Sequence, residues 1–378
     1  MIKRQLVVIG GGPSGLTAAI EAAKAGVEVL LLDANKKAGG QLFKQIHKFF
    51  GSSAHRAGVR GIDIGKELLA EAEQYGVEVW LDSVAIGLFE EKKIAVEIGD
   101  DASEKKVVTI LAEKIIIACG ASENVVRFKG WTMPGVIGAG AAQTMVNVNR
   151  VLPGKKVLMI GSGNVGLIVS YQLMQGGADV VALVEAAPKI GGYAVHASKI
   201  ARAGVPIYTR HTVLEVFGGD RVKGAVICEV DEKWQPVPGS EKVYEVDAVA
   251  IAAGLKPLTE LAVMHGCKTE FDPVLGGWVP LHDENMESTS PGIYVVGDIT
   301  GVEEANTALE EGRLAGVAAA EKFGKITPED AAKIKRDIWE RLNGLRFGPH
   351  GEVRMKAKAN QIKKFTQVST KLREGGAK

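Results

Sequence analysis

Blocks of apolar and polar positions along the chain predict short buried strands, each followed by a helix. The run RQLVVIG at 4–10 is short and rich in β-branched residues, which is typical of a parallel strand buried on both faces. The alanine-rich segment at 16–26 then predicts a helix, and VEVLLLD at 27–33 predicts a second strand. Strands that alternate with helices predict an α/β fold with parallel sheets. The same order of elements returns at 155–161, 167–177 and 178–185.

A glycine-rich turn joins the first strand to its helix. Gly10 permits the tight turn, Gly12 lets a pyrophosphate approach the backbone, and Gly15 lets the helix pack closely on the strand. The helix N-terminus offers N–H donors to phosphates. Asp33, 23 residues after Gly10, is placed to accept hydrogen bonds from ribose hydroxyls. The unit therefore predicts a dinucleotide site, with a merely tight turn as the alternative. Its expected contacts are Gly10, Gly12, Pro13, Ser14, Gly15 and Asp33.

The second turn repeats this pattern about 150 residues later. Its acidic residue, Glu185, follows Gly161 by 24 residues, nearly the spacing of the first unit. Two complete units imply two nucleotide sites, and such a pair is commonly one flavin and one nicotinamide. A degenerate or purely structural second site is the alternative. The expected contacts are Gly161, Gly163, Asn164, Val165, Gly166 and Glu185.

Three later segments complete the pattern: strands that run into Gly120 and Gly254, and a strand that ends in Gly297-Asp298 before a helix of small residues. With the two turns, they resemble the two-dinucleotide-binding-domain flavoproteins of the pyridine nucleotide–disulfide oxidoreductase superfamily, over roughly residues 4–323. That resemblance implies FAD in the first unit and NAD(H) in the second. It implies that Asp298 binds the ribitol or pyrophosphate region of FAD.

The resemblance also implies a domain plan. An FAD domain in two pieces, 1–122 and 252–325, would enclose an NAD(P)-binding domain at 123–251 in a thioredoxin-reductase-like layout, and 326–378 would form a helical basic tail. The sequence GGQL at 39–42 implies that Gln41 lies along the flavin. The cofactor contacts implied in this way are Gly40, Gln41, Gly120, Gly254, Gly297, Asp298 and Ala305.

Composition narrows the function. The net charge of +1 over 378 residues gives no overall attraction to nucleic acid, and no apolar run reaches the roughly 18 residues of a transmembrane helix. The three cysteines form no CxxC, which argues against a zinc site or a disulfide framework and favours a cytoplasmic location. No metal is expected. Because disulfide reductases of the superfamily carry a redox cysteine pair, thioredoxin-reductase and lipoamide-dehydrogenase chemistry is excluded.

A closer resemblance lies at 130–157 and 301–320. These stretches are similar to the FAD/NAD-type subunit of multi-component amine and amino-acid dehydrogenases, a group that includes opine oxidases, hydrogen cyanide synthase, dye-linked proline dehydrogenase and the sarcosine oxidase α subunit. The resemblance implies a second protein subunit. Two departures matter: nothing after Cys267 could ligate the iron–sulfur cluster that many of these proteins carry, and the intact second turn favours nicotinamide binding.

The loop at 41–61 supplies the candidate catalytic residues, His47 and Lys48. In the superfamily the chain passes near the isoalloxazine here, so cationic groups could stabilise anionic reduced flavin or bind a carboxylate substrate, and His47 could relay a proton. The alternative is a solvated basic loop with one histidine bonded to backbone. The charged or titratable residues of the loop are Lys44, His47, Lys48, His55, Arg56 and Arg60.

The tail at 341–378 has ten Lys or Arg residues against two Glu. Ile362, Phe365, Val368 and Leu372 recur at helical spacing and predict a short amphipathic helix. Such a helix could dock a partner subunit or lie on an anionic membrane surface. It could equally pack on its own domain or fray.

The sequence thus predicts a cytoplasmic FAD-dependent oxidoreductase. It would exchange hydride between NAD(H) and flavin, and pass electrons to or from a second small-molecule substrate, acceptor or subunit, without a redox disulfide. One alternative is a subunit of a proline-, sarcosine- or opine-type dehydrogenase whose substrate is oxidised on another chain. The other is a non-catalytic electron-transfer or assembly component. A homo-oligomer is compatible with each of these.

Overall fold

The computed structural model describes residues 1–99, 105–348 and 351–375, with side chains described as far as residue 371. The chain forms two compact units, one of Met1–Ser122 with Lys256–Lys378 and the other of Glu123–Leu255. The second unit is therefore inserted into the first along the sequence. Of the stretch at 326–378, predicted as a helical basic tail, the described residues belong to the first unit.

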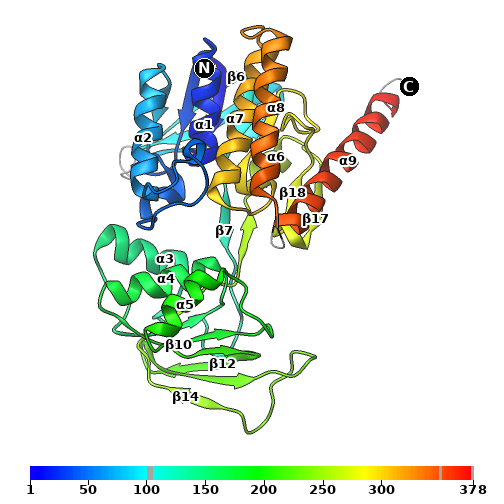
Figure 1. Ribbon diagram of the computed structural model, residues 1–378. Coiled ribbons are helices and arrows are strands. Elements are labelled where there is room, and N and C mark those ends of the chain that lie inside the picture. The colour runs from blue at the N-terminus through cyan, green and yellow to red at the C-terminus, as the bar shows by residue number, and fades with distance from the viewer. Residues whose placement is uncertain (100–104, 349–350, 376–378) are drawn as a thin grey trace. The chain divides into compact units, whose positions relative to one another are not determined.

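The first unit is built on a mostly parallel sheet with β1 at its centre (Figure 1). β1 pairs in parallel with β2 on one side and β6 on the other, and β6 also pairs with β19. β3 extends the sheet beyond β2, while β5 and β4 add antiparallel strands beyond β6. The strands are β1 (Ile2–Ile9), β2 (Val29–Leu32), β3 (Glu78–Trp80), β4 (Ser83–Phe89), β5 (Lys93–Ile98), β6 (Lys106–Ile117) and β19 (Ile293–Val295).

Helices cover one face of this sheet. Alternate residues of β1, such as Leu6 and Val8, point into a core formed with these helices, while Val7 and Ile9 point to the other face. α1 and α7 pack closely where Gly312 has no side chain. A Cβ there would overlap the backbone of Ser14, so only glycine fits. The helices of this layer are α1 (Pro13–Lys24), α2 (Gly61–Gln74), α7 (Ala305–Lys322) and α8 (Pro328–Leu345), and α6 (Glu260–Met264) contacts β4.

The second unit contains a five-stranded parallel sheet in the order β11-β10-β9-β15-β8. Helices α3, α4 and α5 pack on one face, and an antiparallel sheet, β12-β13-β14, packs on the other. The parallel strands are β8 (Val136–Gly138), β9 (Lys156–Ile160), β10 (Asp179–Glu185), β11 (Ile207–Thr209) and β15 (Ala248–Ile251). The helices and antiparallel strands are α3 (Ala139–Thr144), α4 (Asn164–Gln175), α5 (Ala194–Arg202), β12 (His211–Gly218), β13 (Val222–Glu229) and β14 (Lys242–Tyr244).

Two short strands, β7 (Ala121–Glu123) and β16 (Leu255–Pro257), pair where the chain passes between the units. The predicted hinge glycines immediately precede them. Gly120 and Gly254 both have positive φ, and their carbonyl oxygens accept hydrogen bonds from Leu258 N and Asn124 N, both at 3.0 Å. The hinge residues are thus held by the paired connections.

The last helix, α9 (Gly351–Gly375), contacts the short helix η5 (Pro273–Leu275) between β17 (Thr269–Asp272) and β18 (Gly277–Pro280). Its buried residues are Ala357, Lys358 and Gln361, which follow one another at helical spacing. The predicted apolar stripe lies further along the same side of the helix, where Ile362, Phe365 and Val368 are only half-buried. The side chain of Leu372 is outside the described residues.

Candidate functional site

The first glycine turn has the geometry of a phosphate cradle. Gly10 has a φ of +110°, and a Cβ there would overlap the carbonyl oxygen of Ala118. A Cβ on Gly15 would overlap the carbonyl oxygen of Gly10, so this glycine lets α1 approach β1. At Gly12 the nearest atom is the Cα of Gly40, 3.9 Å from the Cβ position. The backbone of Gly12 is therefore open where a pyrophosphate would approach.

Asp33 follows the carboxyl end of β2 and is buried, with 4% of its surface exposed. One carboxylate oxygen accepts from Gly11 N at 2.7 Å, and the other accepts from both N–H donors of Asn35, at 2.8 and 2.9 Å. A carboxylate has about four lone-pair positions. Among the described donors three are used, which leaves room for a ribose hydroxyl at the oxygen bonded to Gly11.

Residues far apart in sequence meet at this turn. Gly39 N donates to Gly11 O at 2.7 Å, and Gly40 packs on Gly12. A Cβ on Gly297 would come within 2.5 Å of Ser14 Oγ, so the Gly297-Asp298 turn lies against the start of α1. Gln41 is exposed, and Ala305 begins α7. The structure thus gathers Gly10–Gly15, Asp33, Gly40 and Gly297 in one place.

Asp298 is the second residue of the short helix η6 (Gly297–Thr300). It keeps part of its surface exposed, yet burial of its carboxyl by surrounding atoms raises its pKa to about 6. The N–H of Glu303 lies 3.5 Å from one of its carboxylate oxygens, a long contact that opposes this rise. The side chain is therefore only weakly held by the backbone.

The second glycine turn has the same geometry as the first. Gly161 has a φ of +97° and packs on the carbonyl oxygen of Ala252, and Gly166 packs on that of Gly161. No heavy atom lies within 4 Å of the Cβ position of Gly163. Glu185 accepts from the backbone N and hydroxyl of Ser162, at 2.9 and 2.5 Å, and from Ala187 N at 2.8 Å.

A glycine pair covers the second turn as Gly39-Gly40 covers the first, a match that sequence reasoning missed. Gly192 N donates to Ser162 O at 2.8 Å, just as Gly39 N donates to Gly11 O. Tyr193 N donates to Oδ1 of Asn164, the first residue of α4, at 2.9 Å, while Val165 is exposed. The glycines six and seven residues after Glu185 were the available signal.

The basic loop holds the two candidate catalytic residues in different surroundings. His47 is half-buried and stacks on Phe49 with ring centroids 5.6 Å apart, whereas Lys48 is exposed. The catalytic roles of His47 and Lys48 stay predictions. Other members of the loop have structural partners: Arg56 pairs with Glu67 and Glu71 at 2.9 and 3.0 Å.

His55 is the buried histidine of this loop. Its Nε2 lies 3.0 Å from a carboxylate oxygen of Glu310 on α7, and its Nδ1 lies 3.0 Å from Ser52 Oγ. The alternative interpretation of the loop gave one histidine a backbone partner; the partner of His55 is instead a buried carboxylate. Glu310 also binds Arg313 and Arg341. This cluster ties the loop to α7 and α8.

All three cysteines are free thiols. Burial raises the pKa of Cys119 to about 12 and also raises the pKa values of Cys228 and Cys267, which disfavours the reactive thiolates. Within the described ranges no group of metal-ligating side chains could hold an ion, and no helix is long and apolar enough to cross a membrane.

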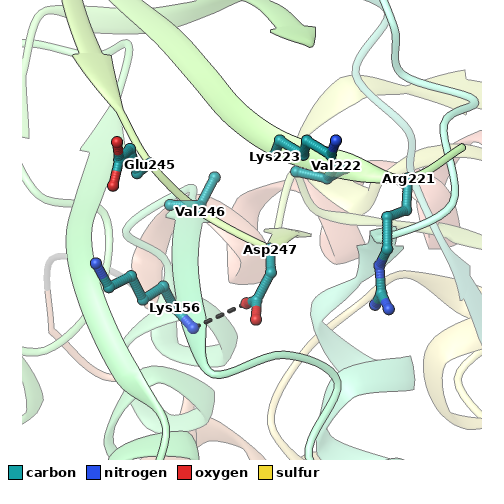
Figure 2. A pocket seen from close by; sticks show the side chains of 7 residues that line it. All are labelled: Lys156, Arg221, Val222, Lys223, Glu245, Val246 and Asp247. Atoms are coloured by element: carbon teal, nitrogen blue, oxygen red, sulfur yellow. Dashed lines mark hydrogen bonds between the residues drawn. The ribbon is translucent and has the colours of Figure 1, made fainter. Parts of the chain in front are cut away.

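Figure 2 shows residues that line a pocket of about 360 Å³ in the second unit, and none of them is a predicted nucleotide contact. The pocket includes Lys156 at the amino end of β9, whereas Gly161 follows the carboxyl end. Asp247 points toward Lys156 and accepts from the backbone N of Lys155 and Lys156, at 3.0 and 2.8 Å. Ligands of open α/β sheets bind at the carboxyl ends of strands, so this pocket does not coincide with the predicted dinucleotide site.

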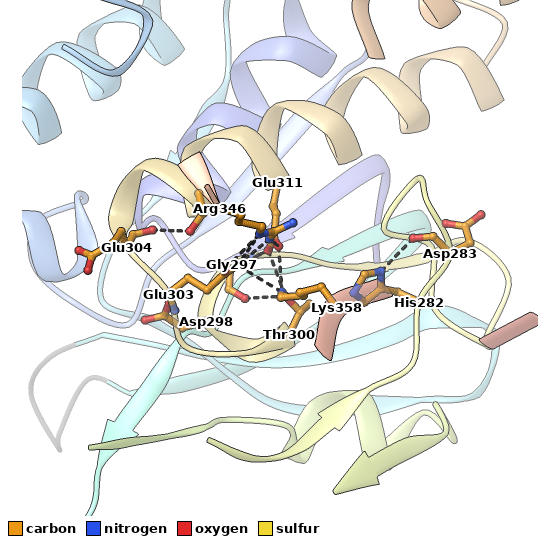
Figure 3. A network of polar contacts seen from close by, with 11 residues as sticks. His282, Asp283, Gly297, Asp298, Thr300, Glu303, Glu304, Glu311, Arg346 and Lys358 are labelled. Carbon is orange, nitrogen blue, oxygen red and sulfur yellow. Dashed lines mark hydrogen bonds and ion pairs between the residues drawn. The ribbon is translucent and has the colours of Figure 1, made fainter. Parts of the chain in front are cut away.

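A buried ionic network adjoins Gly297-Asp298 and was not expected from the sequence (Figure 3). Glu311 of α7 and Glu303 meet Arg346, at the end of α8, and Lys358 of α9. All four side chains are at most 5% exposed. A signal existed in the pair Glu310-Glu311 within an alanine- and glycine-rich helix, because buried carboxylates require cationic partners.

The sequence pattern of the pyridine nucleotide-disulphide oxidoreductase family matches residues 4–312. Over 331 residues the chain is 28% identical to an opine oxidase subunit of Agrobacterium tumefaciens (strain Ach5), covering 83% of this chain and 65% of that protein. It is 26% identical over 356 residues to hydrogen cyanide synthase subunit HcnB of Pseudomonas protegens, covering 89% and 74%. The chain therefore spans about two thirds of the opine oxidase subunit's length.

Among solved structures, the thioredoxin reductase of T. acidophilum matches with a TM-score of 0.69 at 22% identity, over 85% of this chain and 99% of that one. This likeness shows the fold, and it confirms the predicted α/β class and thioredoxin-reductase-like layout. The predicted resemblance to the pyridine nucleotide–disulfide superfamily and to opine oxidase and hydrogen cyanide synthase subunits is also confirmed.

Proposed function

Because the chain belongs to the pyridine nucleotide-disulphide oxidoreductase family, we propose that it is an FAD-dependent oxidoreductase that exchanges hydride between NAD(H) and flavin. Proteins of this family bind FAD and NAD(P). The observation that carries the proposal is the pair of open glycines, Gly12 and Gly163, each beside a carboxylate placed for a ribose. Two such cradles support two dinucleotides, and electrons would continue to or from a second substrate or subunit.

FAD belongs in the first unit in this proposal. The cradle fits it: the backbone of Gly12 is open to a pyrophosphate, Asp33 has acceptor capacity for the ribose, and α1 supplies N–H donors. Asp298, on the turn that packs against Ser14, would accept a hydrogen bond from the ribitol region. When bound, FAD supplies two-electron chemistry that no side chain provides.

NAD(H) belongs in the second unit. Gly163 leaves its backbone open, and Glu185 retains an acceptor position on the oxygen that Ala187 binds. Its negative charge would oppose a 2′-phosphate, which favours NADH over NADPH. The segment AAPKIGG after Glu185 offers one lysine and no arginine to recruit that phosphate.

The chain's thiols would take no part in this transfer. Raised thiol pKa values at Cys119, Cys228 and Cys267 leave few thiolates for dithiol exchange. Hydride would therefore pass directly between the two cofactors, with Gly120 and Gly254 as the hinge positions. His47 and Lys48 are the proposed proton relay and cation of the site.

A second candidate is that the chain works as one subunit of a larger amine- or amino-acid-oxidising enzyme. The matched relatives are named as subunits of opine oxidase and hydrogen cyanide synthase. The outer part of α9 adds a specific observation: Lys363 and Lys371 are exposed beside the half-buried Ile362, Phe365 and Val368. A partner acidic at the contact would complement this surface.

The test of the partner is charge reversal. Replacing Lys363 and Lys371 by Glu should leave NADH-dependent flavin reduction unchanged. The same change should weaken co-purification with the proposed partner subunit, sought among the products of neighbouring genes. If the variant and the wild type recover the same partner equally, α9 is not the contact.

The cofactor assignment is tested on the purified protein. We expect FAD, released by denaturation, in an amount approaching one per chain, and a visible flavin absorption spectrum. Protein that carries stoichiometric nucleotide but no flavin, and that takes up none when FAD is added, would overturn the assignment.

A further inference from the structure

We propose that Arg346 and Lys358, two cations of the C-terminal helices, are positioning residues that hold the Gly297–Glu303 turn in the form that binds FAD. The inference rests on the proposed FAD site in the first unit. Both cations lie beyond residue 312, where the family match ends. Neither is expected to touch the flavin.

Glu311 lies at the centre of the buried ionic network (Figure 3). Its carboxylate accepts from Gly297 N at 3.0 Å and from Thr300 Oγ1 at 3.0 Å, so it binds both ends of η6. It also binds Arg346 at 2.6 Å and Lys358 at 2.8 Å. Only 2% of Glu311 is exposed, so an ionised carboxylate here requires these cations.

Lys358 reaches the turn itself. Its ammonium group donates to Thr300 Oγ1 as well as to Glu311, while Thr300 Oγ1 bonds Gly297 O at 2.9 Å. The side chain is 3% exposed and comes from the buried face of α9. A chain of contacts therefore runs from α9 through Thr300 to Gly297, whose neighbour is Asp298.

Arg346 holds the other end of the turn. Its guanidinium forms hydrogen bonds with both carboxylate oxygens of Glu303, at 2.5 to 3.2 Å, and one with Glu311. Paired contacts of this kind fix orientation as well as distance. The backbone N–H of Glu303 is the one that faces Asp298. The two cations thus fix the residues on both sides of the predicted flavin ligand.

The charges around Asp298 supply a readout that simple loss of packing would not alter. The charged groups that act on it are Glu311 of α7, Lys358 of α9 and Glu303 of its own loop; the two carboxylates raise its pKa and Lys358 lowers it. Without Lys358 the pKa of Asp298 should rise above its value of about 6. If the ionised carboxylate binds FAD, retention of FAD should then fail at a higher pH than in the wild type.

The experiment compares FAD affinity and thermal stability across matched variants of the full chain. Lys358→Met and Arg346→Met remove the two cations. Lys364→Met removes a lysine of the same helix whose partner is Glu270, at 2.6 Å, away from the turn. Leu342→Ala creates a cavity at a fully buried position of α8 and lowers the melting temperature without removing any side chain of the network. The backbone carbonyl of residue 342, which accepts from Arg346 N at 3.0 Å, is kept in this variant.

We expect the dissociation constant for FAD to rise about tenfold or more in Lys358→Met and Arg346→Met, which corresponds to about 1.4 kcal/mol or more. It should change less than about twofold in Lys364→Met and Leu342→Ala when measured well below their melting temperatures. The pH midpoint for FAD retention should move upward in Lys358→Met only. If either cation variant fails to fold, the double variant Glu311→Gln with Lys358→Met is measured in its place. The double variant removes one buried charge of each sign.

The outcomes separate this inference from the proposed function. Wild-type protein that binds no FAD overturns both. Wild-type binding with unchanged FAD affinity and pH midpoint in the cation variants overturns the inference alone, and the network is then structural. Equal loss of FAD affinity in Leu342→Ala would also overturn it, because destabilisation would explain the effect.

Discussion

Gly12 and Gly163 occupy equivalent places in the two turns, and both have the negative φ of an ordinary residue, −76° and −63°. A Cβ at Gly163 has no heavy atom within 4 Å, and a Cβ at Gly12 would lie 3.9 Å from the Cα of Gly40, an ordinary contact distance. Gly10 and Gly15 differ, because side chains at those positions would overlap carbonyl oxygens. Substitutions at the open glycines therefore test ligand approach, whereas substitutions at the closed ones test the fold.

The first prediction uses Gly12→Val and Gly163→Val as controls for each other. Gly12→Val should fold with a melting temperature near that of wild type and lose FAD, because the side chain fills the path of the pyrophosphate. Gly163→Val should keep FAD and lose reduction by NADH. Absorbance spectra and stopped-flow reduction check both. Retention of FAD in Gly12→Val would contradict the assignment of the first unit.

The second prediction is a preference for NADH set by Glu185. Two unit charges about 4 Å apart interact by roughly 4 kcal/mol at a surface-like dielectric of about 20. After solvent screening, flavin reduction should be about a hundredfold more efficient with NADH than with NADPH. Glu185→Gln should reduce this ratio about tenfold or more by removing the charge. Equal efficiencies with the two cofactors in wild type would contradict this account.

The third prediction concerns the cysteines. Replacing Cys119, Cys228 and Cys267 together by Ala should leave the rate of flavin reduction by NADH within about twofold of wild type, because their raised pKa values disfavour thiolates. A lower melting temperature is expected, since Cys228 and Cys267 are buried. Loss of reduction in a folded, FAD-loaded variant would reveal thiol chemistry.

At the scale of elements, the sequence predicted best where local rules decide the structure. Two strand–turn–helix–strand units, their glycines and their acids follow from short spacings, and the structure has them. The tail shows where such reasoning ends. The spacing of Ile362, Phe365 and Val368 predicted an amphipathic helix there but left its partner open, and it did not indicate that α9 would bury Ala357, Lys358 and Gln361. Lys358 pairs with Glu311, which lies 47 positions away in the sequence. Hydrophobic periodicity does not predict a contact between residues so far apart.

The fourth prediction is that α9 is required by the first unit. Truncation after Gly351 removes Lys358 and leaves Glu311 and Glu303 with Arg346 as their remaining cation in the network. Loss of one partner of a buried ion network costs about 3–5 kcal/mol. We expect a melting temperature lower by several degrees and weaker FAD binding. Truncation after Phe365 keeps Lys358 and the Lys364–Glu270 pair and should be close to wild type. Identical stability of both truncated chains would contradict the role of α9.

At the scale of the whole molecule, the first unit concentrates buried carboxylates on α7. Burial alone would raise the pKa of Glu310, but His55, Arg341 and Arg313 lower it to about 2. Burial likewise opposes ionisation of Glu311, and Lys358 and Arg346 lower its pKa to about 2. Carboxyls with pKa values below the ordinary 4.5 stabilise the fold above that pH and lose this contribution as the pH falls.

The fifth prediction follows from the lowered pKa values of Glu310 and Glu311, which make the fold less stable in acid. The free energy of unfolding should decline between about pH 5 and pH 2, with Glu310 contributing as much as about 3 kcal/mol. Glu310→Gln should have lower stability at neutral pH and a shallower decline in acid, as measured by denaturant unfolding. Equal slopes in variant and wild type would show that Glu310 keeps an ordinary pKa.

The central claim is that one chain brings NADH and FAD together for hydride transfer without a dithiol. Anaerobic titration of the FAD-loaded protein with NADH, followed by flavin absorbance, tests it most directly. The account predicts complete bleaching at about one NADH per flavin, since each reaction transfers two electrons. Flavin that stays oxidised with excess NADH, yet is bleached by a chemical reductant, would contradict the claim.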